Sequence, residues 1–178
     1  MDWPTGDGQR IVVYLRPRHL ALPVVLELLA TADTRAVCVI PGAAPEFIAK
    51  HANDKIAIHP QAVALGPLLD SADAMIGYAG TGTLSEALLK GIPQLMIPAT
   101  MEQYLGARRV EEMGAGIMID ARHNPTDMRE ALSRLMGEPS YKQQAKTFAQ
   151  RHAAFCTEQA AAKAADQILE QLGKGDKR

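Results

Sequence analysis

Short apolar runs alternate with longer segments of helical pattern along this chain. Six runs have the length of a strand, and they cover residues 11–15, 36–40, 56–58, 74–76, 94–97 and 116–119. They lack the apolar–polar alternation of a sheet with one solvated face, which is typical of parallel strands covered by helices on both sides. The pattern predicts an α/β fold, a Rossmann-like, doubly wound, six-stranded parallel sheet with C-terminal helices.

Proline and glycine mark the helix boundaries between these runs. Pro23 suits the first turn of a helix, and Gly91 followed by Pro93 ends one. Asn124 and Pro125 have the character of a helix cap and a first helical residue. The strands are therefore expected to be joined by helical crossovers.

Beyond the last run the pattern is wholly helical. Six apolar or aromatic positions follow a helical spacing and predict one docked stripe, made of Ala145, Phe148, Ala149, His152, Phe155 and Cys156. Within it, His152 is interpreted as a core histidine. An alanine-rich helix is expected over residues 159–172, so the domain is predicted to cover residues 1–172, followed by a polar, frayed tail at 173–178.

The expected topology locates a ligand site. Six strands joined by right-handed crossovers most commonly take the order 3-2-1-4-5-6, which places the topological switch point between strands one and four. Ligands of such sheets bind there, outside the carboxyl ends of the strands. In this chain those ends carry residues 16–19, with the sequence RPRH, and residues 77–83, with the sequence GYAGTGT.

Composition narrows the classes of partner. The 178 residues include 19 Lys and Arg against 20 Asp and Glu, a formal charge of −1 that gives no indication of a nucleic acid partner. Two cysteines, Cys38 and Cys156, are too few for a disulfide scaffold. The sequence has no leader-like or membrane-length apolar stretch, so we expect a cytoplasmic location and no membrane span. The five histidines are scattered without metal-ligand spacing, and no metal is predicted.

The segment after the fourth run has the chemistry of an anion site. It reads IGYAGTGTLSEALLKGIPQLMIP, in which Gly80 and Gly82 permit close approach to the backbone. Free N–H groups at a helix start carry partial positive charge, so a diphosphate over Gly82, Thr83 and Leu84 would be held by backbone donors and the Thr83 hydroxyl. The alternative is that the glycines only allow a tight turn.

Other nucleotide and hydrolase signatures are missing from the sequence. The GxGxxG fingerprint should follow the first strand, where this chain has RPRH, and neither GxxxxGK[ST] nor GxSxG occurs. Dinucleotide-dependent dehydrogenases, ordinary P-loop enzymes and serine hydrolases therefore have little support. Thr83 to Glu86 also spells a capping box, and Thr100 to Gln103 can cap a helix, so each of these residues taken alone is better explained as a cap.

An ordered set of motifs over about residues 55–120 changes that interpretation. The stretch contains a Pro-Gln pair, an acidic residue before an apolar strand, then YAGTGTLSEAL, a GxP, a further Pro, and EQYLGARRV. It resembles the donor-binding half of GT-B glycosyltransferases, whose corresponding motifs are HGGxGTxxEAL and DQxxNAxxV. The similarity is greatest to the UDP-glycosyltransferase type and extends to the bacterial enzyme that adds N-acetylglucosamine to lipid-linked peptidoglycan precursor.

The resemblance implies a role for each matching residue. Gly80, Gly82 and Thr83 would hold the donor diphosphate, and Glu86 would accept hydrogen bonds from the ribose hydroxyls. The segment His59, Pro60 and Gln61 would face the nucleobase through backbone groups. Glu102 and Gln103 would contact hydroxyls of the transferred sugar, which suits a carboxylate–amide pair that can accept and donate several hydrogen bonds.

Three positions depart from the motifs. Tyr78 stands where the family commonly has histidine, and a phenol brings no positive charge to a diphosphate. Arg16 and Arg18 stand where the family often has a Gly-Ser type of turn, across the switch point from Tyr78, and we hypothesise that one of them supplies the charge. The alternative for each is a solvated surface arginine. Gly106 replaces the asparagine of the NA pair.

The resemblance implies one half of a GT-B enzyme. Such a half binds an NDP-sugar donor, with UDP or TDP as the nucleotide, as substrate and without a further cofactor, and it contains no catalytic residue of its own. A hexose-type sugar would pass to an acceptor hydroxyl with inversion. The chain alone is expected to be inactive without an N-terminal acceptor-binding domain. Alternatives are the donor-binding subunit of a split glycosyltransferase and a non-catalytic nucleotide-binding module.

Overall fold

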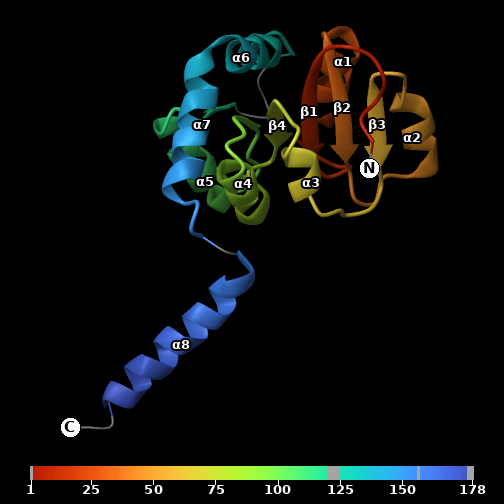
Figure 1. The fold of residues 1–178 in the computed structure, drawn as a ribbon. Coiled ribbons are helices and arrows are strands. Elements are labelled where there is room, and N and C mark those ends of the chain that lie inside the picture. The colour runs from red at the N-terminus through yellow and green to blue at the C-terminus, as the bar shows by residue number, and fades with distance from the viewer. Residues whose placement is uncertain (1, 120–124, 156, 176–178) are drawn as a thin grey trace.

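The computed structural model describes residues 2–119, 125–155 and 157–175. Its centre is a six-stranded parallel sheet with the order β3-β2-β1-β4-β5-β6, which confirms the predicted topology (Figure 1). The strands are β1 (Gln9–Tyr14), β2 (Thr34–Val39), β3 (Ile56–His59), β4 (Ala74–Gly77), β5 (Gln94–Met96) and β6 (Gly116–Met118). Tyr14 pairs with Gly77 at the carboxyl ends of β1 and β4, so the switch point lies beside these two residues.

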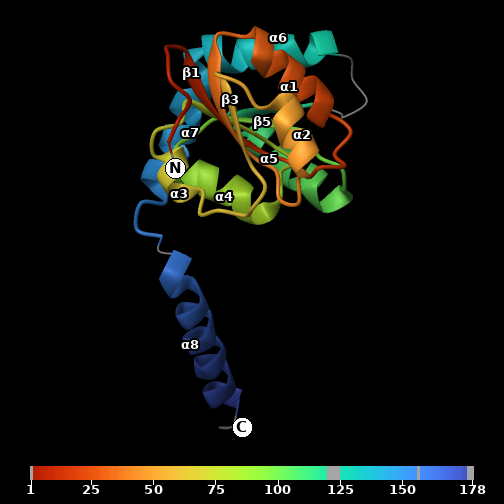
Figure 2. The same ribbon diagram turned by 90° about the vertical axis from the view of Figure 1, so that its right-hand side faces the viewer.

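Helices cover both faces of the sheet, because successive strand residues point to opposite sides and both sets are apolar. On one face, Ile11 and Val13 pack with α1 (Leu22–Thr31), α2 (Pro45–His51) and α6 (Pro125–Gly137). On the other face, Val12 packs with α3 (Gly66–Leu69) and α4 (Thr81–Leu89), and Met96 packs with α4, α5 (Met101–Glu112) and α7 (Pro139–Arg151). Figure 2 shows α1 and α6 above the sheet and α3 and α4 below it.

The helix boundaries follow the proline and glycine signals. Pro23 lies in the first turn of α1, and α6 begins at Pro125. Gly91 follows α4 with a φ of +68°, a left-handed conformation that favours glycine and ends a helix. These predictions are confirmed, whereas Asn124 lies outside the described residues.

The predicted apolar stripe after the last strand is only partly confirmed. Ala145 in α7 is fully buried, and Phe148 packs against the same cluster. The helix ends at Arg151, however, and His152 is exposed and lies against Phe148 with 4.4 Å between ring centroids. The interpretation of His152 as a core histidine is wrong, because the chain leaves the helix where the stripe would continue. Phe155 is 54% exposed, and Cys156 lies outside the described residues.

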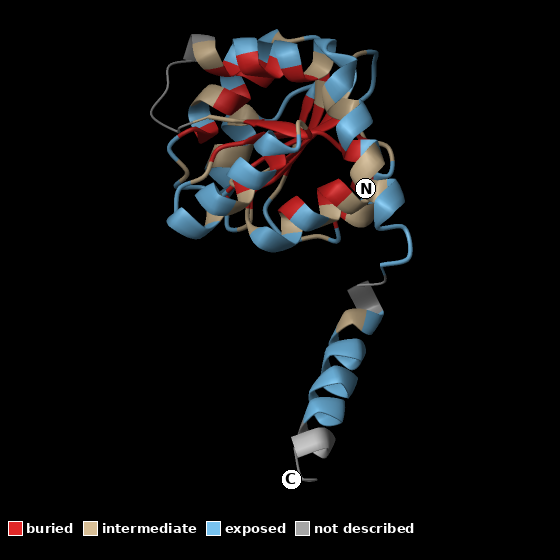
Figure 3. Cartoon of the chain, turned by 90° about the vertical axis from the view of Figure 1, so that its left-hand side faces the viewer, coloured by how far each residue is buried: buried red, intermediate tan, exposed pale blue. Residues whose placement is uncertain are grey.

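The last helix, α8 (Thr157–Gly175), extends away from the rest of the domain (Figure 1). It contains the helix expected over 159–172 and continues through residues 173–175, where a tail was predicted. Almost all of its described side chains are exposed, including Ile168 and Leu169 (Figure 3). Within the described ranges, no helix combines the length and the apolar character needed to cross a bilayer.

Candidate functional site

The start of α4 stands directly after β4 at the switch point. Gly80 is the N-cap, and the first helical hydrogen bond runs from the Leu84 N–H to the Gly80 carbonyl at 2.9 Å. The N–H groups of Thr81, Gly82 and Thr83 precede that bond and have no partner within the helix. The prediction that Leu84 is a free donor is therefore wrong, and the backbone donors lie one residue earlier.

Thr83 does not form the predicted capping box. Because α4 begins at Thr81, Thr83 lies inside the first turn, and its hydroxyl donates to the Gly80 carbonyl at 3.0 Å. Its hydroxyl proton is therefore directed at the backbone and away from a ligand. Glu86 lies on the next turn, half-buried, with Oε1 3.3 Å from the point where a Cβ on Gly66 would stand. That places the Glu86 carboxylate beside the start of α3.

The two glycines of the turn differ in whether the fold requires them. A Cβ on Gly80 would lie 2.7 Å from Cε2 of Tyr78, so the packing of the Tyr78 ring excludes a side chain there. A Cβ on Gly82 would meet nothing within 4 Å. The fold therefore does not require Gly82, and its missing side chain leaves open space over the helix start. Ala79, which is buried, holds the left-handed conformation of the turn with a φ of +59°.

A cleft of about 340 Å³ opens at the start of α4. It is lined by Tyr14, Arg16, Tyr78, Gly80, Thr81, Gly82, Thr83, Glu102 and Gln103. A second hollow of about 330 Å³ shares Tyr14, Arg16 and Tyr78 with the cleft and continues past Pro17 to Pro41 at the end of β2. The two hollows together follow the carboxyl ends of β4, β1 and β2, as the switch-point prediction requires.

Arg16 is exposed, lines the cleft and contacts the Tyr78 ring. Its Cζ lies 5.6 Å from the centroid of the Tyr78 ring, within the range of a cation–π contact. The Tyr14 and Tyr78 rings lie 5.9 Å apart and support that position. The structure therefore brings together Arg16, Tyr78 and the start of α4. Arg18 is exposed and does not line this cleft.

The start of α5 forms the opposite side of the cleft. Thr100 caps the helix by accepting from the Gln103 N–H at 3.4 Å, and the Gln103 side chain accepts from the Ala99 N–H at 2.9 Å. The capping prediction for these two residues is confirmed. Glu102 accepts a hydrogen bond from the hydroxyl of Thr81, which ties the starts of α4 and α5 together. The sequence analysis missed Thr81, because the T-x-x-E pattern directed attention to Thr83.

The segment predicted to face the nucleobase lies at the carboxyl end of β3. The carbonyls of His59 and Pro60 already accept from the N–H groups of Ile40 and Gly42, both at 2.9 Å. The His59 Nε2 atom is buried and has no hydrogen-bond partner among the described residues. None of His59, Pro60, Gln61 and Glu86 lines the two hollows at the switch point, so their roles remain predictions.

A histidine that the sequence analysis left without a role lies beside this cleft. His19 Nε2 is 3.0 Å from the Ile97 carbonyl, and its Nδ1 accepts from the Ala21 N–H at 3.3 Å. A carbonyl can only accept, so Nε2 carries the proton and the ring is neutral. Burial lowers the pKa of His19, and the hydrogen bond to Ile97 opposes this effect in part.

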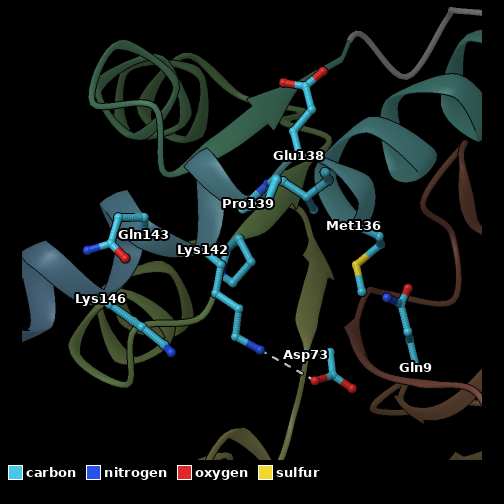
Figure 4. A pocket seen from close by; sticks show the side chains of 10 residues that line it. Gln9, Asp73, Met136, Glu138, Pro139, Lys142, Gln143 and Lys146 are labelled. Atoms are coloured by element: carbon cyan, nitrogen blue, oxygen red, sulfur yellow. Dashed lines mark hydrogen bonds and ion pairs between the residues drawn. The ribbon is translucent and has the colours of Figure 1, made fainter.

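Another hollow, of about 350 Å³, lies at the amino ends of the strands (Figure 4). Asp73, immediately before β4, lies 3.5 Å from Lys142 Nζ and also accepts from the Arg10 N–H at 2.9 Å. The ion pair between Asp73 and Lys142 connects α7 to the sheet.

The fold is shared with solved glycosyltransferases. The glycosyltransferase VinC, whose crystal structure is a complex with DTDP, matches with a TM-score of 0.76 at 24% identity over 92% of this chain and 42% of that chain. The 4′-demethylrebeccamycin synthase of Lentzea aerocolonigenes is 28% identical over 160 residues, which are 85% of this chain and 37% of that protein. The aclacinomycin-T 2-deoxy-L-fucose transferase of Streptomyces galilaeus is 38% identical over 82 residues, which are 44% of this chain and 19% of that protein.

These relatives define a class, the sugar transferases with a GT-B fold. The chain spans less than half the length of each of them. The sequence model of one family, the C-terminal domain of proteins like erythromycin biosynthesis protein CIII, matches residues 24–168. The chain belongs to that family. The resemblance to the donor-binding half of a GT-B enzyme is thereby confirmed, over a longer stretch than residues 55–120.

Proposed function

We propose that this chain binds a nucleoside diphosphate sugar and forms the donor half of a glycosyltransferase. The observation that carries the proposal is the pairing of a cation with a helix start across one cleft. The N–H groups of Thr81, Gly82 and Thr83 lie on one side, and Arg16 lies on the Tyr78 ring on the other. Backbone donors at a helix start and a guanidinium are both suited to a diphosphate.

The chemistry follows from where charge develops during transfer. The acceptor oxygen attacks the anomeric carbon as the bond from that carbon to the diphosphate breaks, and the electron pair leaves with the nucleoside diphosphate. Arg16 and the α4 start are placed to stabilise that developing negative charge. Glu102, held by Thr81, and Gln103 would bind hydroxyls of the transferred sugar. The base that takes the acceptor proton would come from an acceptor-binding half, within the same protein or as a partner subunit.

The nucleoside would extend from this cleft along the strand ends towards β3. The second hollow, at Tyr14 and Pro41, leads in that direction, and the base would then lie near His59, Pro60 and Gln61, with Glu86 available to the ribose. Thymidine diphosphate is the nucleotide that we favour, because VinC was crystallised with DTDP. The reaction requires no metal in this proposal, and we expect the protein in the cytoplasm.

The proposal is tested by a ligand panel on the chain as it stands. Thermal unfolding is followed with TDP, UDP, GDP and ADP at increasing concentration, and isothermal titration measures the dissociation constant of the strongest. A ligand at 100 times its dissociation constant stabilises the folded state by about 2.7 kcal/mol, so even weak binding becomes visible at millimolar concentration. Selective stabilisation by TDP or UDP is expected, and no stabilisation by any of the four would contradict the proposal.

A further inference from the structure

His19 is held by four hydrogen bonds in the turn between β1 and α1. Its N–H donates to the Arg16 carbonyl at 3.0 Å and its carbonyl accepts from the Leu22 N–H at 3.0 Å, which closes the turn that begins with Arg16. The imidazole accepts from the Ala21 N–H and donates to the Ile97 carbonyl. The backbone bonds shape the turn, and the side-chain bond to Ile97 attaches it to the far side of the cleft.

That attachment crosses a strand. In the sheet, β4 lies between β1 and β5, so the ends of β1 and β5 are linked by backbone hydrogen bonds only through β4. Ile97 follows β5 and donates its own N–H to the Gly77 carbonyl at 2.8 Å. Three residues later Thr100 caps α5, whose first turn carries Glu102 and Gln103. The His19 ring therefore connects the arginine side of the cleft with the side that carries Glu102.

We propose that His19 is a positioning residue for the donor. It fixes Arg16 and the start of α5 at one separation across the end of β4, so that the diphosphate and the sugar are bound together. It does so without touching either group. This inference rests on the proposed function, because it concerns the geometry of the same cleft.

The positioning depends on the neutral imidazole. A proton on Nδ1 would face the Ala21 N–H, which is itself a donor, and the hydrogen bond between them would be lost. The charged residues nearest in sequence to the joined segments are Arg16 and Arg18 on the His19 turn and Glu102 in the first turn of α5. The first turn of α1 carries no acidic residue, and the remaining charged residues of α1 and α5 lie in later turns. The two arginines oppose a further positive charge. Acid is therefore expected to loosen the turn and to weaken donor binding.

The test uses TDP-glucose as the probe, because its diphosphate is a diester whose charge does not change between pH 5.5 and pH 8. Dissociation constants are measured by isothermal titration for the wild-type chain, His19→Ala and His19→Gln. Glutamine keeps an N–H able to reach the Ile97 carbonyl but has no proton to gain in this range. His152→Gln, at an exposed histidine beyond α7, is the matched control.

We expect about tenfold weaker binding for His19→Ala at pH 7.5 and binding within about threefold of wild type for His19→Gln. The wild-type affinity should fall as the pH drops from 7.5 to 5.5, and the His19→Gln affinity should not. A His19→Gln profile that falls as steeply as the wild type would overturn the inference, as would binding by a folded His19→Ala variant within twofold of wild type. Absence of binding by the wild-type chain would instead count against the proposed function.

Discussion

The two ends of the sheet carry hollows of nearly equal volume, about 340 Å³ at the carboxyl ends and about 350 Å³ at the amino ends. They differ in how their polar groups are satisfied. At the amino ends, Asp73 is paired with Lys142 and Arg10. At the carboxyl ends, and within the described part of the chain, Arg16 contacts an aromatic ring but no carboxylate, and the N–H groups at the α4 start precede the first helical bond. Unsatisfied donors, rather than volume, distinguish the proposed binding site from the other hollow.

The largest effect on ligand binding is expected from removing the positive charge of Arg16 from the cleft at the carboxyl ends. Arg16→Ala should weaken binding of TDP by about 10- to 100-fold, because a hydrogen bond to a charged group contributes about 1.5–3 kcal/mol. Isothermal titration measures the loss. Arg18→Ala is the matched control and should change the dissociation constant less than twofold, because Arg18 is exposed and does not line the cleft. Equal losses in the two variants would show that only the overall charge matters. Lys142→Ala, in the other hollow, should leave TDP binding unchanged.

A pair of glycine variants separates the needs of the ligand from those of the fold. Gly80→Ala should destabilise the chain by about 1–3 kcal/mol, because the added Cβ meets the Tyr78 ring. Gly82→Ala should leave the free energy of unfolding unchanged or raise it by up to about 1 kcal/mol, since alanine is favoured in a helix and the site is open. It should nevertheless weaken TDP binding about tenfold. Urea unfolding and titration measure the two quantities, and unchanged affinity in Gly82→Ala would show that the helix start is not the diphosphate site.

Acid should lower the free energy of unfolding through His19, which lies at the carboxyl ends of the strands. Its pKa lies below the ordinary value of 6.5, so the unfolded chain takes up a proton at pH values where the folded chain does not. The contribution of His19 to stability is therefore complete above about pH 6.5 and is lost as the pH falls towards the folded pKa, by at most about 1.4 kcal/mol per pH unit. Urea unfolding between pH 7.5 and 5.5 should show a smaller loss for His19→Gln than for wild type. Equal losses would contradict this assignment.

The smallest effect is expected at Ala79. A left-handed φ costs a residue with a Cβ about 1–2 kcal/mol. Glycine avoids this cost, but it also raises the conformational entropy of the unfolded chain, which offsets part of the gain. Ala79→Gly should therefore raise the free energy of unfolding by about 0.5–1 kcal/mol, as measured by the urea midpoint. A lower midpoint would mean that the packing of the buried methyl group outweighs the backbone strain.

The sheet could be predicted from the sequence more accurately than the site could. The apolar pattern predicted six parallel strands, and the commonest order of such doubly wound sheets then gave the strand order and the switch point that the structure has. The start of α4 was placed too late, because Gly80 caps the helix without a side chain while Thr83 and Glu86 mimic a capping box. The hydrogen bond from Thr81 to Glu102 joins residues of two helices that are 21 positions apart in the sequence, and no local pattern encodes it. Likewise, no glycine or proline marks the end of α7 at Arg151, so the apolar stripe was extended too far.

The contact between Arg16 and Tyr78, which stands where the family commonly has histidine, has a consequence for the charge of the cleft. A guanidinium keeps its proton throughout the range in which proteins stay folded, so Arg16 stays charged as the pH rises, whereas an imidazolium would lose its proton and its positive charge. A spent nucleoside diphosphate bound here would still face the full cation after the sugar has gone. Under the proposed function, its departure would require the Arg16 side chain to release the diphosphate, and we expect nucleotide release to be slow for that reason.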